Sequence, residues 1–163
     1  GSTSSLISKN NNANSFQIGN FIYGTDGSGH KNAIINNFGS RNRFSKKKSG
    51  ETLELNGPEI YKFALQRVPE AINNFLDKNN LKLDDIDYFV FHQANEFINK
   101  SIQRLLNIPD KKIFNQMQTT GNTSSSSIPI VLSNNFSQLL QGKNILLVGF
   151  GGGLSWGVCL IKK

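Results

Sequence analysis

The sequence contains one cysteine, Cys159, in 163 residues. A lone cysteine forms no intramolecular disulfide and cannot build a cysteine-based zinc site. This usage fits a reducing compartment, and we expect no bound metal.

Long apolar runs are also missing from the chain. No stretch reaches the roughly eighteen apolar residues of a membrane span, and no apolar stretch lies near the start. We therefore expect neither a membrane span nor an intact signal peptide.

Acidic residues are few relative to basic ones. The chain has 11 Asp and Glu against 18 Lys and Arg, a net charge of +7. This charge favours acidic partners such as phosphates, nucleic acid or an acidic protein. The one dense basic run, residues 41–48, lies in a loop-like stretch without any nucleic-acid-binding motif, so we interpret it as a solvated loop and expect no nucleic-acid partner.

The composition is sufficient for one globular domain. Hydrophobic residues make up 37% of the chain, and it has twelve Phe. We expect the domain over residues 16–163. The opening Gly1-Ser2 is typical of a tag remnant, and the Asn-rich run that leads up to residue 15 is expected to be mobile.

Apolar periodicity predicts the first strand and helix. Alternation of apolar and polar residues over 16–23 indicates a strand. The glycine cluster at 24–29 indicates a turn. A phosphate-binding loop is the alternative for this cluster, but no helical pattern follows it directly. A helix is expected over residues 57–78. Asn56 is its N-cap, and Pro69 is expected to kink it.

The second half of the chain predicts further strands and helices. Residues 87–91 indicate a central strand buried on both faces, followed by a helix from Ala94. A second helix is expected over 122–141, and the strands at 144–150 and 154–161 should form an antiparallel hairpin. The expected buried face of the helix after residue 94 comprises Ala94, Phe97, Ile98, Ile102, Leu105 and Leu106. This order predicts a layered α/β domain, a mixed β-sheet with helices.

Two polar residues stand at junctions between elements. His92 directly follows the strand at 87–91, where open α/β sheets place their ligands, although a lone histidine is also compatible with a structural role. Asn122 follows Gly121 and precedes a run of small residues, which lets a ligand approach closely. It is either a residue that contacts such a ligand or a helix N-cap.

A glycine-rich turn forms a third junction. Gly151 to Gly153 lie between two strands and can leave backbone amides open to a substrate oxygen, as in an oxyanion hole. The turn does not fit a dinucleotide-binding loop, because Leu154 stands at the third glycine position and a strand follows.

These junctions belong to motifs that stand in a fixed order. The motifs are His92-Gln93-Ala94-Asn95, then Gly121-Asn122-Thr123-Ser124 with Ser127-Ile128-Pro129, then Gly149-Phe150-Gly151-Gly152-Gly153-Leu154-Ser155-Trp156-Gly157. Together they closely resemble the carboxyl-terminal half of β-ketoacyl-acyl-carrier-protein synthase III. Elongating synthases use two histidines and chalcone-type synthases have a proline in the glycine turn, so both fit less well.

The resemblance implies a thiolase-like fold, of which this chain supplies one half. In the family, a cysteine in the amino half takes an acyl group from acyl-coenzyme A. Malonyl on acyl carrier protein then loses carbon dioxide, and its carbanion attacks the acyl thioester to initiate type II fatty acid synthesis. The implied substrates are acyl-CoA and malonyl-phosphopantetheine, with no bound cofactor. The implied partners are the amino-terminal half, acyl carrier protein and a second copy of the full enzyme, in a bacterial cytoplasm or a plastid-type organelle.

The resemblance also implies roles for individual residues. His92 and Asn122 would donate hydrogen bonds to the malonyl thioester oxygen, and Gly152 would offer its amide to the acyl-enzyme oxyanion. Phe150 matches the aromatic residue beside the nucleophile. Lys62 and Arg104 match basic residues that dock the acidic carrier protein.

Two positions depart from the family pattern. Phe97 stands where the bacterial enzyme has a docking arginine, and Cys159 lies in the last strand, where a small buried residue rather than a nucleophile is expected. The chain alone is therefore expected to be inactive. The alternatives are an acyltransferase of a secondary pathway on the same fold and a non-catalytic module that binds coenzyme A or carrier protein.

Overall fold

The structure is a computed structural model that describes residues 1–9, 14–36 and 52–163. The basic run at residues 41–48 lies outside the described residues, and so does the centre of the Asn-rich run, residues 10–13.

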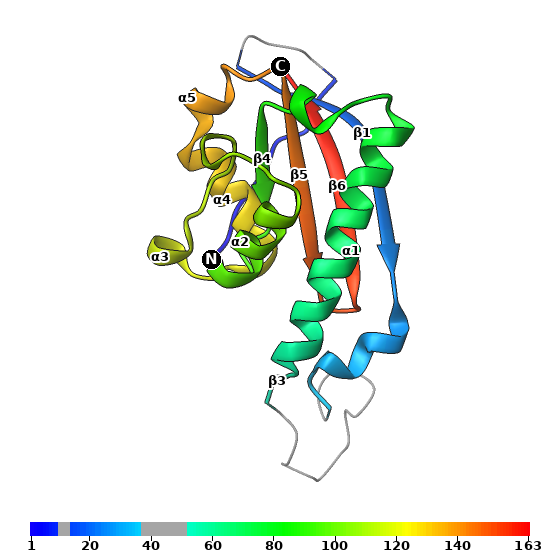
Figure 1. The fold of residues 1–163 in the computed structure, drawn as a ribbon. Coiled ribbons are helices and arrows are strands. Elements are labelled where there is room, and N and C mark those ends of the chain that lie inside the picture. The colour runs from blue at the N-terminus through cyan, green and yellow to red at the C-terminus, as the bar shows by residue number, and fades with distance from the viewer. Residues whose placement is uncertain (10–13, 37–51) are drawn as a thin grey trace.

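A four-stranded mixed sheet forms the middle of the domain (Figure 1). Its strands are β1 (Gln17–Thr25), β4 (Tyr88–Phe91), β5 (Asn144–Gly151) and β6 (Ser155–Lys162), in the order β1-β6-β5-β4. β4 and β5 are parallel, whereas β6 is antiparallel to both β5 and β1. The predicted mixed sheet and terminal hairpin are confirmed. A separate small ribbon pairs β2 (Ala33–Ile34) with β3 (Glu54–Leu55).

Helices cover both faces of the sheet. The α-helices are α1 (Gly57–Lys78), α2 (Glu96–Leu105), α3 (Met117–Thr120), α4 (Ser127–Asn134) and α5 (Phe136–Leu139). Short 3₁₀ turns are η1 (Gly27–Asn32), η3 (Leu83–Asp85), η4 (Asp110–Lys112) and η5 (Ser124–Ser126). Helix α1 has the predicted bounds, because the Asn56 side chain accepts a hydrogen bond from the Glu59 amide at its start. It continues through Pro69.

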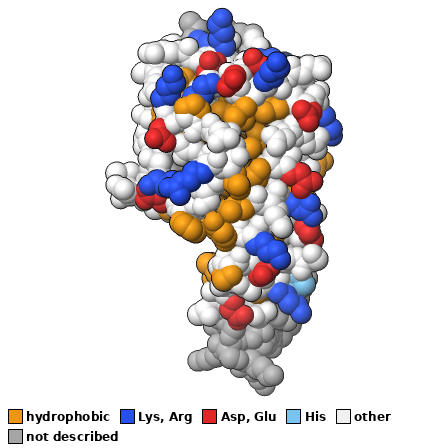
Figure 2. All heavy atoms as spheres, viewed as in Figure 1, with side chains coloured by type: hydrophobic (Ala, Val, Ile, Leu, Met, Phe, Trp, Pro, Cys, Tyr) orange, Lys and Arg blue, Asp and Glu red, His pale blue; other side chains and the backbone are white. Residues whose placement is uncertain are grey.

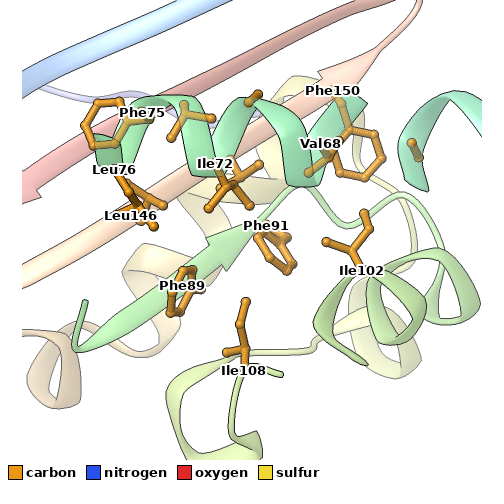
Figure 3. Packing of buried hydrophobic residues seen from close by; sticks show 14 of the residues in the cluster. Val68, Ile72, Phe75, Leu76, Phe89, Phe91, Ile102, Ile108, Leu146 and Phe150 are labelled. Carbon is orange, nitrogen blue, oxygen red and sulfur yellow. The ribbon is translucent and has the colours of Figure 1, made fainter. Parts of the chain in front are cut away.

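The sheet separates two hydrophobic clusters, because successive residues of a strand point to opposite faces. In β5, Leu146, Val148 and Phe150 join the cluster beneath α1 and α2, while Ile145 and Leu147 face α4 and α5. Figure 3 shows the larger cluster, in which α1 packs over β4 and β5. The structure therefore has the predicted layered α/β arrangement.

Strand β4 differs from the prediction in its position. Phe89, Val90 and Phe91 are buried on both faces of the sheet as predicted, whereas Tyr88 is half-buried. The strand stands at the end of the strand order rather than in the centre. A single parallel bridge from Phe89 to Ile113 lies along its outer edge. An apolar run therefore predicts that a strand is buried on both faces, but it does not predict the position of the strand in the sheet. An edge strand is also buried when other segments cover it.

Two helix predictions were wrong in detail. Helix α2 begins at Glu96 rather than Ala94, because the Asn95 side chain accepts a hydrogen bond from the Ile98 amide and caps it. The helix expected over 122–141 is divided into η5, α4 and α5, and the last two meet at Asn135, whose side chain donates to the Val131 carbonyl.

The predicted buried face of α2 was also too wide. Phe97 is 66% exposed and Leu105 is 56% exposed, whereas Ile98 and Ile102 are buried. The glycine cluster at 24–29 was predicted as a turn, and the structure places the first turn of η1 there, capped by the Asp26 side chain.

Candidate active site

A cavity of about 800 Å³ lies at the carboxyl ends of β4 and β5, beside the β2–β3 ribbon. It brings together four of the residues singled out by sequence, namely His92, Asn122, Phe150 and Gly152. Its lining combines the polar groups of His92, Asn122 and Gly152 with apolar side chains from β3, α1 and α2. Such a concave and mainly apolar site with a few convergent polar groups is typical of a binding or active site.

His92 is fixed through its backbone at the end of β4. Its amide donates to the Val148 carbonyl at 2.7 Å and so extends the parallel pairing by one residue. Its carbonyl accepts from the Ala94 amide at 2.9 Å and from Asn99 Nδ2 at 3.0 Å. These contacts hold the chain at the point where it leaves the sheet for α2.

The His92 ring is held from two sides. Its edge meets the Phe150 ring at a centroid distance of 5.5 Å and an angle of 83°. Its Nδ1 lies 2.7 Å from Ser127 Oγ at the start of α4. Burial lowers the pKa of His92 from its usual value of 6.5, so the neutral imidazole predominates at pH 7.

The Asn122 side chain is oriented through both ends of its amide. Oδ1 accepts from the Ser124 amide at 2.8 Å, and Nδ2 donates to the Ala94 carbonyl at 3.2 Å. An amide nitrogen has two hydrogens, so one remains for another acceptor in the cavity. The contact to Ser124 resembles the N-cap alternative, and it leaves this second hydrogen available. Gly121 before it has φ +63°, a conformation that favours glycine.

The glycine turn between β5 and β6 is braced from outside. Leu154 exchanges two backbone hydrogen bonds with Asp26, at 2.8 and 3.0 Å. The Leu154 side chain packs on Gly29, where an added Cβ would lie 2.7 Å from Leu154 Cδ1. Gly153 has φ +138°, which restricts this position to glycine. Within the described part of the chain, the Gly152 amide has no hydrogen-bond acceptor.

Gln93 was part of a motif but had no predicted role. It is fully buried, and its side-chain amide donates to the Phe91 carbonyl at 2.9 Å and the Phe114 carbonyl at 3.4 Å. Its Oε1 accepts from the Gln116 amide at 2.9 Å. Gln93 therefore ties the end of β4 to the segment that leads toward Asn122. The sequence signal for it was a polar residue two positions after the end of an apolar strand.

Lys62 and Arg104 lie outside the cavity. Both are exposed, on α1 and α2 respectively. Their helices are joined by the hydrogen bond from the Tyr61 hydroxyl to Ser101 Oγ, at 3.2 Å, and by the stacking of Phe97 on Tyr61 at 5.2 Å. Figure 2 shows apolar side chains gathered along the middle of this face, with Lys and Arg beside them.

Cys159 does not line the cavity. It lies in β6 opposite Leu147, and burial raises the pKa of its thiol. A protonated thiol in the middle of a sheet is a poor nucleophile. Across the described ranges, no three His, Cys, Asp or Glu side chains are grouped as metal ligands would be. In the same residues no helix has the length and hydrophobicity that a membrane crossing requires.

The fold is that of a thiolase-like condensing-enzyme domain. A crystal structure of a 3-oxoacyl-(acyl-carrier-protein) synthase III matches with a TM-score of 0.81 and 34% identity, over 90% of this chain and 48% of that one. The corresponding enzyme of Thermus thermophilus matches with a TM-score of 0.78 and 29% identity, over 91% of this chain and 46% of that one.

Residues 76–163, more than half of the chain, match the family described as 3-Oxoacyl-[acyl-carrier-protein (ACP)] synthase III C terminal, and the chain belongs to this family. A Beta-ketoacyl-[acyl-carrier-protein] synthase III of Clostridium perfringens is 47% identical over 112 residues, which are 68% of this chain and 35% of that protein. One from the alga Porphyra umbilicalis is 39% identical over 114 residues, 69% of this chain and 35% of that protein. The matched residues thus span about a third of the length of these curated relatives.

Proposed function

We propose that the chain is the carboxyl-terminal catalytic half of a condensing enzyme that joins an acyl group from acyl-CoA to malonyl-acyl carrier protein. The observation that carries this proposal is the convergence of His92, Asn122 and the Gly152 amide on one cavity. The names of the relatives, which are synthases acting with acyl carrier protein, support the same reaction.

The proposed reaction begins on the missing half. A cysteine thiolate there attacks the acyl-CoA thioester, and coenzyme A leaves as the thiol. In the malonyl group the bond to the carboxylate then breaks, carbon dioxide leaves, and the electron pair forms an enolate. The hydrogen of His92 on its free nitrogen and the second hydrogen of Asn122 Nδ2 stabilise the enolate oxygen, since both donors are already in place before charge develops.

The second step forms the new carbon–carbon bond. The enolate carbon attacks the acyl-cysteine carbonyl, and the negative charge moves to the carbonyl oxygen. The Gly152 amide is suited to donate a hydrogen bond to this oxygen. When the tetrahedral intermediate collapses, the cysteine thiolate leaves and the 3-ketoacyl product remains on the carrier. Phe150, which packs against His92, keeps this side of the cavity apolar and so favours loss of the charged carboxylate.

Reconstitution tests the proposal directly. The chain is mixed with a separately produced amino-terminal half of a synthase III, and condensation of labelled acetyl-CoA with malonyl-carrier is followed. We expect activity only when both halves are present, because neither the nucleophile nor the two donors alone complete the site. Folded assemblies that never condense would contradict the proposal. Assemblies that use a free small-molecule acceptor instead of malonyl-carrier would favour the secondary-pathway acyltransferase.

Docking of the carrier protein on α1 and α2 gives a further prediction. Changing both Lys62 and Arg104 to Glu is expected to raise the KM for malonyl-carrier about tenfold with little change in kcat, because the acidic carrier meets repulsion instead of attraction. The effect should shrink as salt is added. The control is a second double variant, with both Lys143 and Lys162 changed to Glu, which makes an equal charge change at exposed positions beside the start of β5 and at the end of β6. An equal KM in all three proteins would rule out this docking face.

A further inference from the structure

Ser127 stands behind the His92 ring, at the first position of α4. Ser127 is buried, with 2% of the residue exposed. Two groups contact Oγ: His92 Nδ1 at 2.7 Å and the backbone amide of Gln93 at 3.2 Å. The roles of donor and acceptor in this cluster determine which ring nitrogen of His92 bears the hydrogen.

The donors and acceptors of the cluster can be counted. The Gln93 amide has a hydrogen and no lone pair, so in this contact Ser127 Oγ is the acceptor. The hydroxyl retains one hydrogen of its own. Among the described residues, Ser127 Oγ has no contact at hydrogen-bond distance besides Gln93 and His92. A buried hydroxyl hydrogen without an acceptor is costly, so it is directed at Nδ1.

We propose that Ser127 is a positioning residue that fixes His92 in the neutral tautomer with hydrogen on Nε2. The hydrogen bonds then form a chain from the Gln93 amide to Ser127 Oγ and from Ser127 to His92 Nδ1. The Nε2 atom, on the other side of the ring, has no hydrogen-bond partner in the described structure. This inference rests on the proposed function, in which His92 donates to the enolate oxygen.

The tautomer matters because the two neutral forms have opposite effects on an oxyanion. With hydrogen on Nε2, the ring presents a donor to the cavity. With hydrogen on Nδ1, it presents a lone pair, which repels the developing negative charge. Ser127 therefore acts on the reaction only through His92. Gln93 supports it in turn, because three hydrogen bonds of its side chain keep its own backbone amide in place.

The second histidine provides an internal contrast. His30 Nδ1 lies 3.0 Å from the Gly27 carbonyl, which can only accept. His30 should therefore favour hydrogen on Nδ1, the opposite tautomer to His92. The chain contains only these two histidines, so a sample with ¹⁵N-labelled imidazole rings gives two sets of signals. A His30→Gln variant assigns them.

The experiment measures the tautomer ratio of the whole 163-residue chain by ¹⁵N NMR at a pH where both rings are neutral. We expect His92 in the wild type to be mostly the Nε2–H form. In Ser127→Ala the ratio of Nδ1–H to Nε2–H should rise about two- to tenfold, the range that corresponds to the net contribution of one hydrogen bond. Ser127→Thr keeps the hydroxyl and should restore the wild-type ratio.

Ser126→Ala is the matched control, because Ser126 is also buried and adjacent but its hydroxyl donates to the Gly1 carbonyl. It should leave the ratio unchanged. A wild-type His92 in the Nδ1–H form overturns the proposal even if Ser127→Ala does not fold, and so does a folded Ser127→Ala protein with an unchanged ratio.

Kinetics of the reconstituted enzyme separate this inference from the proposed function. Ser127→Ala should lower kcat with little change in the KM for malonyl-carrier, because Ser127 is buried and acts through the His92 ring. If the NMR result holds but His92→Ala condenses at the wild-type rate, the proposed function fails while the tautomer assignment stands. If His92→Ala is inactive but the tautomer ratio does not respond to Ser127, only the positioning role fails.

Discussion

Replacing His92 with alanine in the reconstituted enzyme is expected to lower the rate of malonyl-carrier decarboxylation by about 10²- to 10³-fold, the usual cost of losing one oxyanion donor. The ring has the features of such a donor, since it is buried, neutral at pH 7 and held at Nδ1 by Ser127. The measurement is release of labelled carbon dioxide at a saturating concentration of malonyl-carrier, so that a change in the affinity for the carrier does not alter the measured rate.

The control for this prediction is His30→Ala, which removes an exposed histidine outside the cavity. It should decarboxylate at the wild-type rate. His92→Ala must also retain the wild-type circular dichroism spectrum, because the ring packs on Phe150. A folded His92→Ala enzyme with the wild-type rate would show that the enolate is stabilised by other groups.

Replacing Phe75 with alanine is expected to destabilise the domain by about 3–5 kcal/mol. Phe75 is fully buried in the cluster between α1 and the sheet, and it lies at the end of α1 away from the cavity (Figure 3). The loss has two parts: the apolar surface no longer buried and the cavity left behind. Since a domain of this kind has a stability of about 5–15 kcal/mol, the variant should unfold at a much lower urea concentration.

Phe97→Ala is the matched control for Phe75, with the same change of side chain at an exposed position. We expect a cost of about 1 kcal/mol or less, mainly from the lost stacking on Tyr61. Equal costs at the two positions would mean that Phe97 is buried in solution, as the sequence pattern of α2 predicted.

Local features of the chain were predictable where a local cause determines them. Helix α1 has its own cap in Asn56, and β5 has a continuous apolar run, so both were found with nearly correct bounds. The apolar stripe of α2 was wider than its buried face because Phe97 contacts Tyr61 at the surface instead of the core. Periodicity identifies apolar residues and does not tell which of them a neighbouring helix will cover.

Non-local features were less accessible from the sequence. The strand order depends on pairing between residues about 57 positions apart, such as Tyr88 with Ile145, and no local pattern encodes it. The same holds for the site. The motifs identified His92 and Asn122 as candidates, but the contact of Ser127 with a histidine 35 residues earlier follows only from the packing of α4 against β4.

The brace on the glycine turn joins two distant parts of the chain. Asp26 and Gly29 follow the first strand, yet they set the position of Leu154 and hence of the turn that contains Gly152. A substitution of Asp26 or Gly29 is therefore expected to shift the proposed oxyanion site, although neither residue contacts a substrate. Among related sequences, substitutions at residues 26–29 and at residues 152–154 are therefore expected to be correlated, although the two segments lie far apart in the chain.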